Sequence, residues 1–246
     1  MKTKMIVHAG SILLFLFFWI LLIELIDNPL LMPSLNAVFI SILNILTSWM
    51  MIQVILMTMF RLLIAILISL FLGVLLGILS GVIPKVSWLI KPYVTVLRTI
   101  PVISIIVILL VLFGFTVAPY VITFLMVFPI IYQAAYEGIR HMDQELKDVY
   151  RLETSDLKLA IRYLYMPLIT PYVTLSILQS FGLGLKVLVM AEYLSQTRNS
   201  IGNALYLSKV NLSYDDVFAW SMLLILMSIG FEYIFRTYQN RKSSVD

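Results

Sequence analysis

The chain of 246 residues contains no cysteine, and only 12% of its residues are charged. Without cysteine it forms no disulfide framework, no thiolate metal site and no thiol nucleophile. Histidine is almost as scarce, with only His8 and His141, and neither a His-Glu-x-x-His nor a Gly-x-Ser-x-Gly motif is present. Those motifs mark metallopeptidases and serine hydrolases. We therefore expect no catalytic residue, no cofactor and no metal site, and the sequence argues against an enzyme.

Apolar residues are abundant instead, since 61% of the chain is hydrophobic and its mean hydropathy is +1.02. A soluble domain has about a quarter of its residues charged, so the composition predicts an all-α polytopic membrane protein. The length suits one domain. The net charge of +4 does not indicate a nucleic-acid partner, because the basic residues are not gathered in one solvated patch. The composition therefore indicates that the lipid bilayer surrounds the protein.

About six apolar segments approach the roughly 20 residues that a helix needs to cross a bilayer. The predicted spans are Ile6–Ile26, Ile52–Gly81, Val94–Phe113, Tyr120–Ala135, Leu168–Ala191 and Val217–Phe235. The fourth is short and contains Pro129, which predicts a kink or a tilt. The first is too long for a signal peptide and lacks a cleavage motif, so we expect it to be retained.

The basic residues predict the orientation of these spans. Six spans place both termini on one side, together with the loop that holds Lys85 and Lys91, the segment 137–167 and the C-terminal tail. That side carries 12 Lys or Arg residues, whereas the opposite loops carry only Arg198 and Lys209. The positive-inside rule therefore predicts cytoplasmic termini. The lack of cysteine fits a bacterial plasma (inner) membrane.

This topology divides the chain into three parts. Residues 1–51 are expected to form the first span and an outer surface helix at Ser34–Met50, where apolar residues recur at helical spacing. Residues 52–236 form the core, and residues 237–246 form a cytoplasmic tail. A second outer segment, Asn199–Asp216, is too polar to span the membrane, so we expect it to be re-entrant or to lie on the surface.

Small residues form a stripe along the second span. Ala65, Ser69, Gly73, Gly77 and Gly81 recur at four-residue spacing. Small side chains let helix backbones approach closely in lipid. The stripe therefore predicts a packing face against another helix, either of the same chain or of a second copy.

A polar segment interrupts the apolar pattern. Between Glu137 and Arg162 lie 11 of the 30 Asp, Glu, Lys and Arg residues. Thr154–Asp156 supplies N-cap chemistry that restarts a helix at about Leu157, and Pro167 is suited to open the next span. A connection of about 30 residues is long for a tether. We therefore expect a helix, a sharp turn and a second helix that dock on a soluble partner at the cytoplasmic face.

The residues of this segment resemble a family motif. Asp148–Tyr150, three residues, Thr154, nine residues and Leu164–Pro167 resemble the EAA loop of ABC importer permeases. The family pattern is Glu-Ala-Ala, three residues, Gly, nine residues and Ile-x-Leu-Pro. The spacing is the same and Pro167 is kept, while Asp148 replaces the Glu and Thr154 replaces the Gly.

Further segments, in family order over about residues 55–235, extend the resemblance to the nitrate/sulfonate/taurine branch. They are Thr58-x-x-Arg61 with the glycine stripe, Leu97–Pro101, Phe113-Gly114, Glu137–Arg140, Ala191-Glu192, Ser200–Gly202 and Asp216–Ala219. Because these segments occur in the right order along most of the chain, their combination is far more specific than any one of them.

The resemblance implies a type I ABC importer permease fold, with an EAA coupling helix in the loop 137–167 between the fourth and fifth spans. It also implies an ATP-driven importer in which this subunit forms the path for a small solute. The implied partners are cytoplasmic ABC ATPases, an extracellular solute-binding protein and a second permease copy in a homodimer. The chain has no Gly-x-x-x-x-Gly-Lys-Ser/Thr loop, so ATP hydrolysis belongs to a partner.

The resemblance also assigns residues. The implied ATPase-coupling residues are Asp148, Val149, Tyr150, Leu152, Thr154, Leu157 and Pro167. The residues assigned to the translocation path or a dimer interface are Arg61, Gly73, Gly77, Pro101, Lys186 and Glu192.

Two basic residues in that second set lie inside predicted spans. A charge at mid-membrane costs roughly 2.5–3.5 kcal/mol, so Arg61 either faces protein or water or snorkels to the outer interface. Lys186 lies in the fifth span, six residues before Glu192. It either faces the path, where it favours an anionic or zwitterionic cargo, or pairs with a carboxylate or carbonyl at a dimer interface. In both cases we expect it to face protein.

A self-contained secondary transporter or channel is the alternative function. Such folds usually show internal repeats with broken helices at matching positions, and no convincing repeat is visible in this sequence. That function also leaves the segment 137–167 without a role. We therefore favour the ABC permease.

Overall fold

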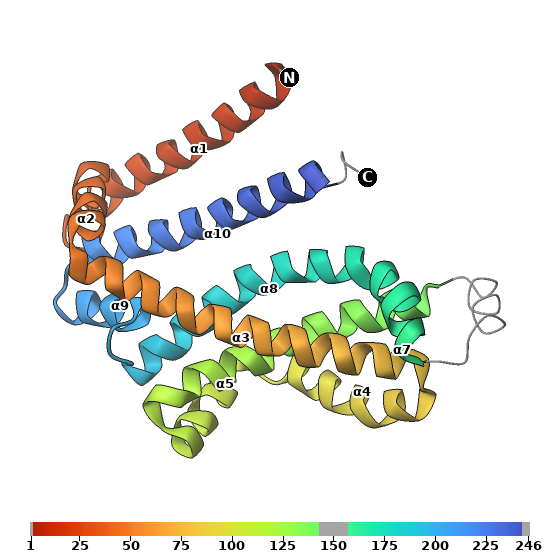
Figure 1. The fold of residues 1–246 in the computed structure, drawn as a ribbon. Coiled ribbons are helices and arrows are strands. Elements are labelled where there is room, and N and C mark those ends of the chain that lie inside the picture. The colour runs from red at the N-terminus through yellow and green to blue at the C-terminus, as the bar shows by residue number, and fades with distance from the viewer. Residues whose placement is uncertain (1, 143–156, 243–246) are drawn as a thin grey trace.

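The structure is a computed structural model that describes residues 2–142 and 157–242. The regular secondary structure of these residues is helical throughout (Figure 1). The elements are α1 Lys2–Ile26, α2 Leu35–Thr47, α3 Trp49–Val82, α4 Pro84–Thr99, α5 Val102–Arg140, α7 Leu157–Ala160, a π-helical turn Ile161–Tyr165, α8 Met166–Ser195, α9 Ile201–Val210 and α10 Tyr214–Lys242.

Four of the described helical stretches are long and apolar enough to cross a membrane. They are Trp49–Val82, Val102–Arg140, Ile161–Ser195 and Tyr214–Gln239. Helix α1, with 25 residues, contains the segment predicted as the first span, and its stretch Leu16–Ile26 is a shorter apolar helix. The prediction of an all-α polytopic membrane protein is confirmed.

The element α5 consists of two helices that reverse direction at Gly114. Gly114 has φ 70° and ψ 172°, a backbone conformation that is essentially restricted to glycine. Ile105 and Ile106, before the bend, share a buried cluster with Ile122 and Met126 after it. A straight helix would hold Ile106 and Ile122 roughly 24 Å apart, so the chain must turn back. The third and fourth predicted spans are therefore separate helices.

The prediction of one continuous helix over Val94–Phe113 is wrong. Helix α4 ends at Thr99 and α5 begins at Val102. Pro101 has no backbone N–H, and its ring disfavours a helical conformation in the residue before it. Ile100 is accordingly extended, with φ −65° and ψ 133°. The third span is thus a broken helix joined at Ile100-Pro101.

The small-residue stripe of α3 packs on α5 of the same chain. A Cβ atom on Gly77 would lie 2.6 Å from the Cβ of Ala135 and 2.8 Å from the carbonyl oxygen of Tyr132. A Cβ atom on Gly73 would lie 3.0 Å from the Cβ of Ile131. Only glycine permits such a close approach of the two backbones. Of the two partners that the sequence allows, the stripe at Gly73 and Gly77 uses the one within the chain.

The outer segment Ser34–Met50 contains the predicted helix, α2. The Ser34 hydroxyl caps it by accepting a hydrogen bond from the backbone N–H of Ala37 at 3.2 Å. One face of α2 is buried against α10, where the Ser41 hydroxyl donates a hydrogen bond to the Asp216 carboxylate. The segment 199–216 likewise contains a short helix, α9, which packs on α8.

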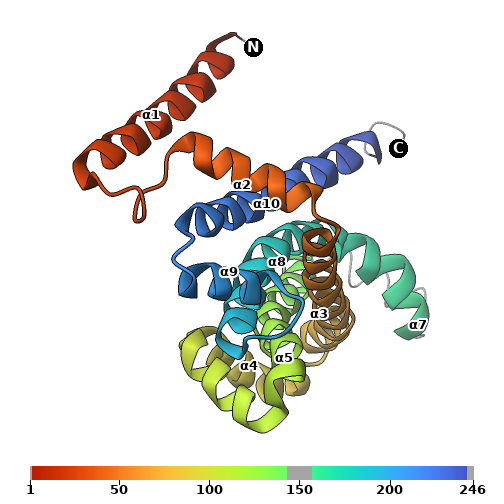
Figure 2. The same cartoon turned by 90° about the vertical axis from the view of Figure 1, so that its left-hand side faces the viewer.

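The helix ends gather at two opposite ends of the molecule (Figure 1). The start of α1, the end of α10, the turn between α3 and α4, and α7 lie at one end, and α2 and α9 lie at the other. Figure 2 shows α3, α5 and α8 side by side, with α1 extending away from them. Helix α1 is attached through Trp19, whose ring centroid lies 5.0 Å from that of Phe218 on α10.

Candidate translocation site

A buried ion pair joins α3 to α8. The Arg61 Nη1 atom lies 2.9 Å from Glu192 Oε1, and the two residues are 5% and 0% exposed. The Thr58 hydroxyl, one turn before Arg61, lies 3.0 Å from Glu192 Oε2 and donates a hydrogen bond to the carboxylate. A charge pair this deeply buried is favourable only when further hydrogen bonds satisfy it.

The chain that follows α8 supplies some of those hydrogen bonds. The backbone N–H of Gly202 donates to Glu192 Oε2 at 3.3 Å, and the N–H of Ile201 donates to the Thr58 hydroxyl at 3.0 Å. A Cβ atom on Gly202 would lie 2.4 Å from the backbone nitrogen of Tyr193. Glycine is therefore required at this position for the start of α9 to reach the carboxylate.

Two further donors of Arg61 also have partners. Its guanidinium donates to the carbonyl oxygens of Arg198 and Asn199 at 3.2 and 3.1 Å. Arg61 thus faces protein, as one of the two predicted placements requires, and does not snorkel to the lipid interface. The network, defined as Arg61, Glu192, Thr58 and their backbone partners, fixes α3, α8 and the α8–α9 connection to one another.

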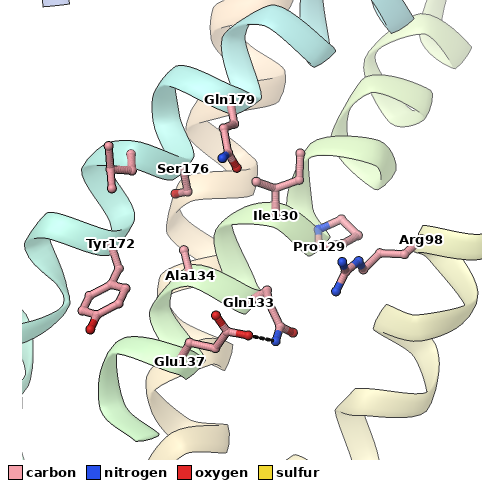
Figure 3. A pocket seen from close by; sticks show the side chains of 10 residues that line it. Arg98, Pro129, Ile130, Gln133, Ala134, Glu137, Tyr172, Ser176 and Gln179 are labelled. Carbon is pink, nitrogen blue, oxygen red and sulfur yellow. Dashed lines mark hydrogen bonds between the residues drawn. The ribbon is translucent and has the colours of Figure 1, made fainter. Parts of the chain in front are cut away.

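A polar cavity of about 270 Å³ lies between α4, α5 and α8 (Figure 3). Its polar lining residues are Arg98 from α4, Gln133 and Glu137 from α5, and Tyr172, Ser176 and Gln179 from α8. Ionisable side chains in membrane spans are costly in lipid and almost always face the protein interior or a water-filled cavity. Their convergence here indicates a hydrated site within the membrane-spanning helices.

The lining offers both charges and neutral hydrogen-bonding groups. Gln133 Nε2 donates to Glu137 Oε1 at 2.5 Å, and Figure 3 shows Arg98 extending from α4 toward α5. The volume approaches the lower end of the range for small-molecule pockets, roughly 300 Å³. Because Arg98 and Gln179 are exposed, the cavity opens onto the surface of a single chain. Such a site suits a small polar solute.

Two other residues assigned to the path or interface are exposed. Pro101 lies at the junction of α4 and α5. Lys186 also is exposed, so the expectation that it faces protein does not hold within one chain. It lies on a face of α8 that the neighbouring helices leave uncovered, beside a groove toward α10 that Gly182 and Ser221 also line.

Most of the predicted ATPase-coupling residues lie outside the described residues. These are Asp148, Val149, Tyr150, Leu152 and Thr154. Leu157 lies in α7, so the chain is helical where the sequence predicts a helix to restart. Pro167 is the second residue of α8, as predicted, and follows the π-helical turn at Ile161–Tyr165.

Sequence reasoning identified none of the six polar cavity residues as a site residue, and Arg98 and Glu137 entered it only within family motifs. A signal was present in the spacing. Gln133 and Glu137 are four residues apart on α5, and Tyr172, Ser176 and Gln179 are spaced by four and three residues on α8. Those spacings place polar groups on one face of an otherwise apolar helix. A search of the predicted spans for helix faces with several polar residues finds both the pair on α5 and the three residues on α8.

The broken third span, the buried charge network and the polar cavity belong to a polytopic membrane protein. Residues 69–242 match the family described as the binding-protein-dependent transport system inner membrane component, and the chain belongs to that family. The match includes the whole cavity, Lys186 and Glu192, whereas Arg61 precedes it. No curated protein matches the chain. The protein is therefore an ABC transport permease of an inner-membrane family.

Proposed function

We propose that this chain is the permease subunit of an ATP-driven importer, and that its polar cavity forms part of the path of a small polar solute. Family membership supports the transport role. The observation that carries the assignment of the path is the cavity lined by Arg98, Glu137 and four neutral polar side chains. An extracellular binding protein would deliver the solute, and cytoplasmic ATPases would drive its passage.

The exposed rim of the cavity supports a second permease copy as a partner. Arg98, Tyr172 and Gln179 are exposed in one chain, and Tyr172 and Gln179 belong to a helix long and apolar enough to cross a membrane. Exposure of an arginine to lipid is unfavourable, whereas a second subunit would cover this surface and keep water in the path. We infer that two copies enclose the path between their cavities in a homodimer.

The continuous helix from α7 to α8 supports mechanical coupling to an ATPase. It runs from Leu157, next to the proposed coupling segment, through the π-helical turn to Ser195. Near its far end, Glu192 is fixed to Arg61 of α3. Movement at the Leu157 end would therefore be transmitted to α3 as rigid-body motion. The coupling residues would be Asp148, Val149, Tyr150, Leu152, Thr154, Leu157 and Pro167.

The arrangement of the helix ends supports the proposed orientation. The start of α1 and the end of α10 lie at the same end as α7 (Figure 1), which agrees with both termini being cytoplasmic. The opposite end, formed by α2 and α9, would receive the extracellular binding protein. The compartment would be the inner membrane of a bacterium.

Co-purification tests the proposed function. The tagged full chain, isolated from its own membranes in mild detergent, should retain an ATPase subunit that the Asp148→Lys variant loses while the variant still folds. Asp246→Lys in the tail is the matched control, because it makes the same charge change outside the coupling segment. Equal ATPase recovery with both variants, or solute uptake by the chain alone without ATP, contradicts the proposal and favours a secondary transporter.

A further inference from the structure

A second polar cavity lies where α3, α4 and α5 meet, at the end of the molecule that the positive-inside rule places in the cytoplasm. Its volume is about 200 Å³. The lining residues that matter are Ser80 of α3, Ser87, Trp88 and Lys91 of α4, and Tyr136 and Arg140 of α5. This cavity is separate from the proposed solute path, since the two share no lining residue.

The cavity has the chemistry of an anion site. Lys91 and Arg140 contribute two positive charges, and no carboxylate lies among its lining residues. The Lys91 Nζ atom is held 4.5 Å from the centroid of the Tyr136 ring, which positions the ammonium group. The buried side chain of Ser80 adds a hydroxyl to the lining. Charge-assisted donors of this kind bind phosphate oxygens strongly.

The position of the cavity indicates where the anion comes from. The 34 residues of α3 extend roughly 50 Å at about 1.5 Å per residue, which exceeds the hydrocarbon thickness of roughly 30 Å. The end of α3 that holds Ser80 therefore reaches the headgroup region. Trp88 at the cavity is 74% exposed, and exposed tryptophan is typical of the membrane interface. Basic pockets between spans at this interface suit anionic lipid headgroups.

We propose that this cavity binds the headgroup phosphate of an anionic phospholipid from the inner leaflet, with Lys91 and Arg140 as the charged ligands. The serine hydroxyls add neutral donors at the base of the site. Because Lys91 belongs to α4 and Arg140 to the end of α5, the bound lipid would fasten these helices together. Arg140 also lies just before the proposed coupling segment, so lipid occupancy would stabilise the cytoplasmic end of the permease.

Lipid retention by the full chain tests the proposal. The probes are nanodiscs of phosphatidylcholine with a minor fraction of phosphatidylglycerol, followed by native mass spectrometry of the released protein. The Lys91→Gln/Arg140→Gln variant should retain phosphatidylglycerol at least about tenfold less than the wild type, because it loses two charge-assisted contacts. Lys85→Gln/Arg236→Gln removes the same charge from the same predicted side and should retain wild-type binding. Lys91→Arg/Arg140→Lys keeps both charges and should also bind.

Three outcomes overturn the inference. Equal retention by the wild type and the Lys91→Gln/Arg140→Gln variant shows that the cavity does not hold the lipid. Equal loss in the Lys85→Gln/Arg236→Gln control shows a general effect of surface charge. Displacement of the lipid by inorganic phosphate alone shows a site for free anions. The melting temperature of each variant in pure phosphatidylcholine verifies that the fold is intact, and it should match that of the wild type.

Discussion

Arg61 of α3 and Glu192 of α8 form a buried ion pair although 131 positions separate them in the sequence. The pair fixes the second span to the end of the helix that begins next to the proposed coupling segment. Thr58 and the backbone around Gly202 complete its hydrogen bonds. The network is therefore a structural bond between spans, and under the proposed coupling it would be the point where movement of α8 reaches α3.

Removing one member of the pair should destabilise the protein more than replacing both. Glu192→Ala leaves the Arg61 guanidinium buried without a counter-charge, and such a change typically costs about 3–5 kcal/mol. Arg61→Ala should cause a similar loss, whereas Arg61→Met/Glu192→Leu should recover much of it. Unfolding in mixed detergent micelles measures these free energies. Equal losses in the single and double variants would contradict the paired arrangement.

The close approach of α3 and α5 predicts that Gly77→Ala is destabilising. Its new Cβ atom would lie 2.6 Å from the Cβ of Ala135, and overpacking of this kind costs about 1–3 kcal/mol. Gly230→Ala is the matched control, because a Cβ atom there meets nothing within 4 Å. That change should be neutral or stabilising by up to about 1 kcal/mol through helix propensity. Thermal melting should separate the two variants, and identical melting temperatures would refute the packing.

The bend at Gly114 predicts that a side chain at this position lowers the stability of the protein through backbone strain alone. A Cβ atom on Gly114 meets nothing within 4 Å, but its φ is +70°. Gly114→Ala should therefore lose about 1–3 kcal/mol through conformational strain. Gly10→Ala is the control, since it has equal space and no positive φ. A Gly114→Ala variant as stable as Gly10→Ala would show that the reversal does not depend on this conformation.

The polar cavity predicts variants that lose transport and keep the fold. Arg98→Gln removes the positive charge, and Gln179→Leu removes an amide from the opposite wall. Each should lower the solute uptake rate by about tenfold or more, because a hydrogen bond to the solute would be lost. Arg236→Gln is the control, since Arg236 forms only an exposed ion pair with Glu232. Unchanged uptake in both cavity variants, measured with the assembled transporter, would remove the cavity from the path.

The apolar helices and their order were predictable because the hydrophobicity of each segment can be seen in that segment alone. A run of apolar residues must be helical in lipid, whichever helices surround it. The spacing of the glycines in α3 likewise predicted a close contact with another helix. The break at Ile100-Pro101 could also have been predicted, since a proline restricts the backbone of the residue before it. It was missed because the hydropathy of Val94–Phe113 is that of a continuous span. The effect of Pro101 on the backbone therefore outweighed the average hydropathy of the segment.

The partners of these residues were not predictable. The stripe of α3 allowed a helix of the same chain or of a second copy, and only the structure places Gly77 against Ala135. Glu192 and Arg61 were both suspected, but nothing in their spacing pairs them. Lys186 was expected to face protein and is exposed, because the face of a long apolar helix that remains uncovered depends on how its neighbours pack.

That this protein is a set of helices in a membrane follows from its amino acids alone, because hydrophobicity and the need for internal backbone hydrogen bonds act on each segment separately. Which polar groups meet depends instead on how the helices pack. Arg98, Glu137 and Gln179 come from three helices, and their convergence on one cavity depends on the crossing of those helices. Long-range geometry of that kind arises from packing between elements, so the spacing along the chain shows a polar face on a helix but not which faces meet.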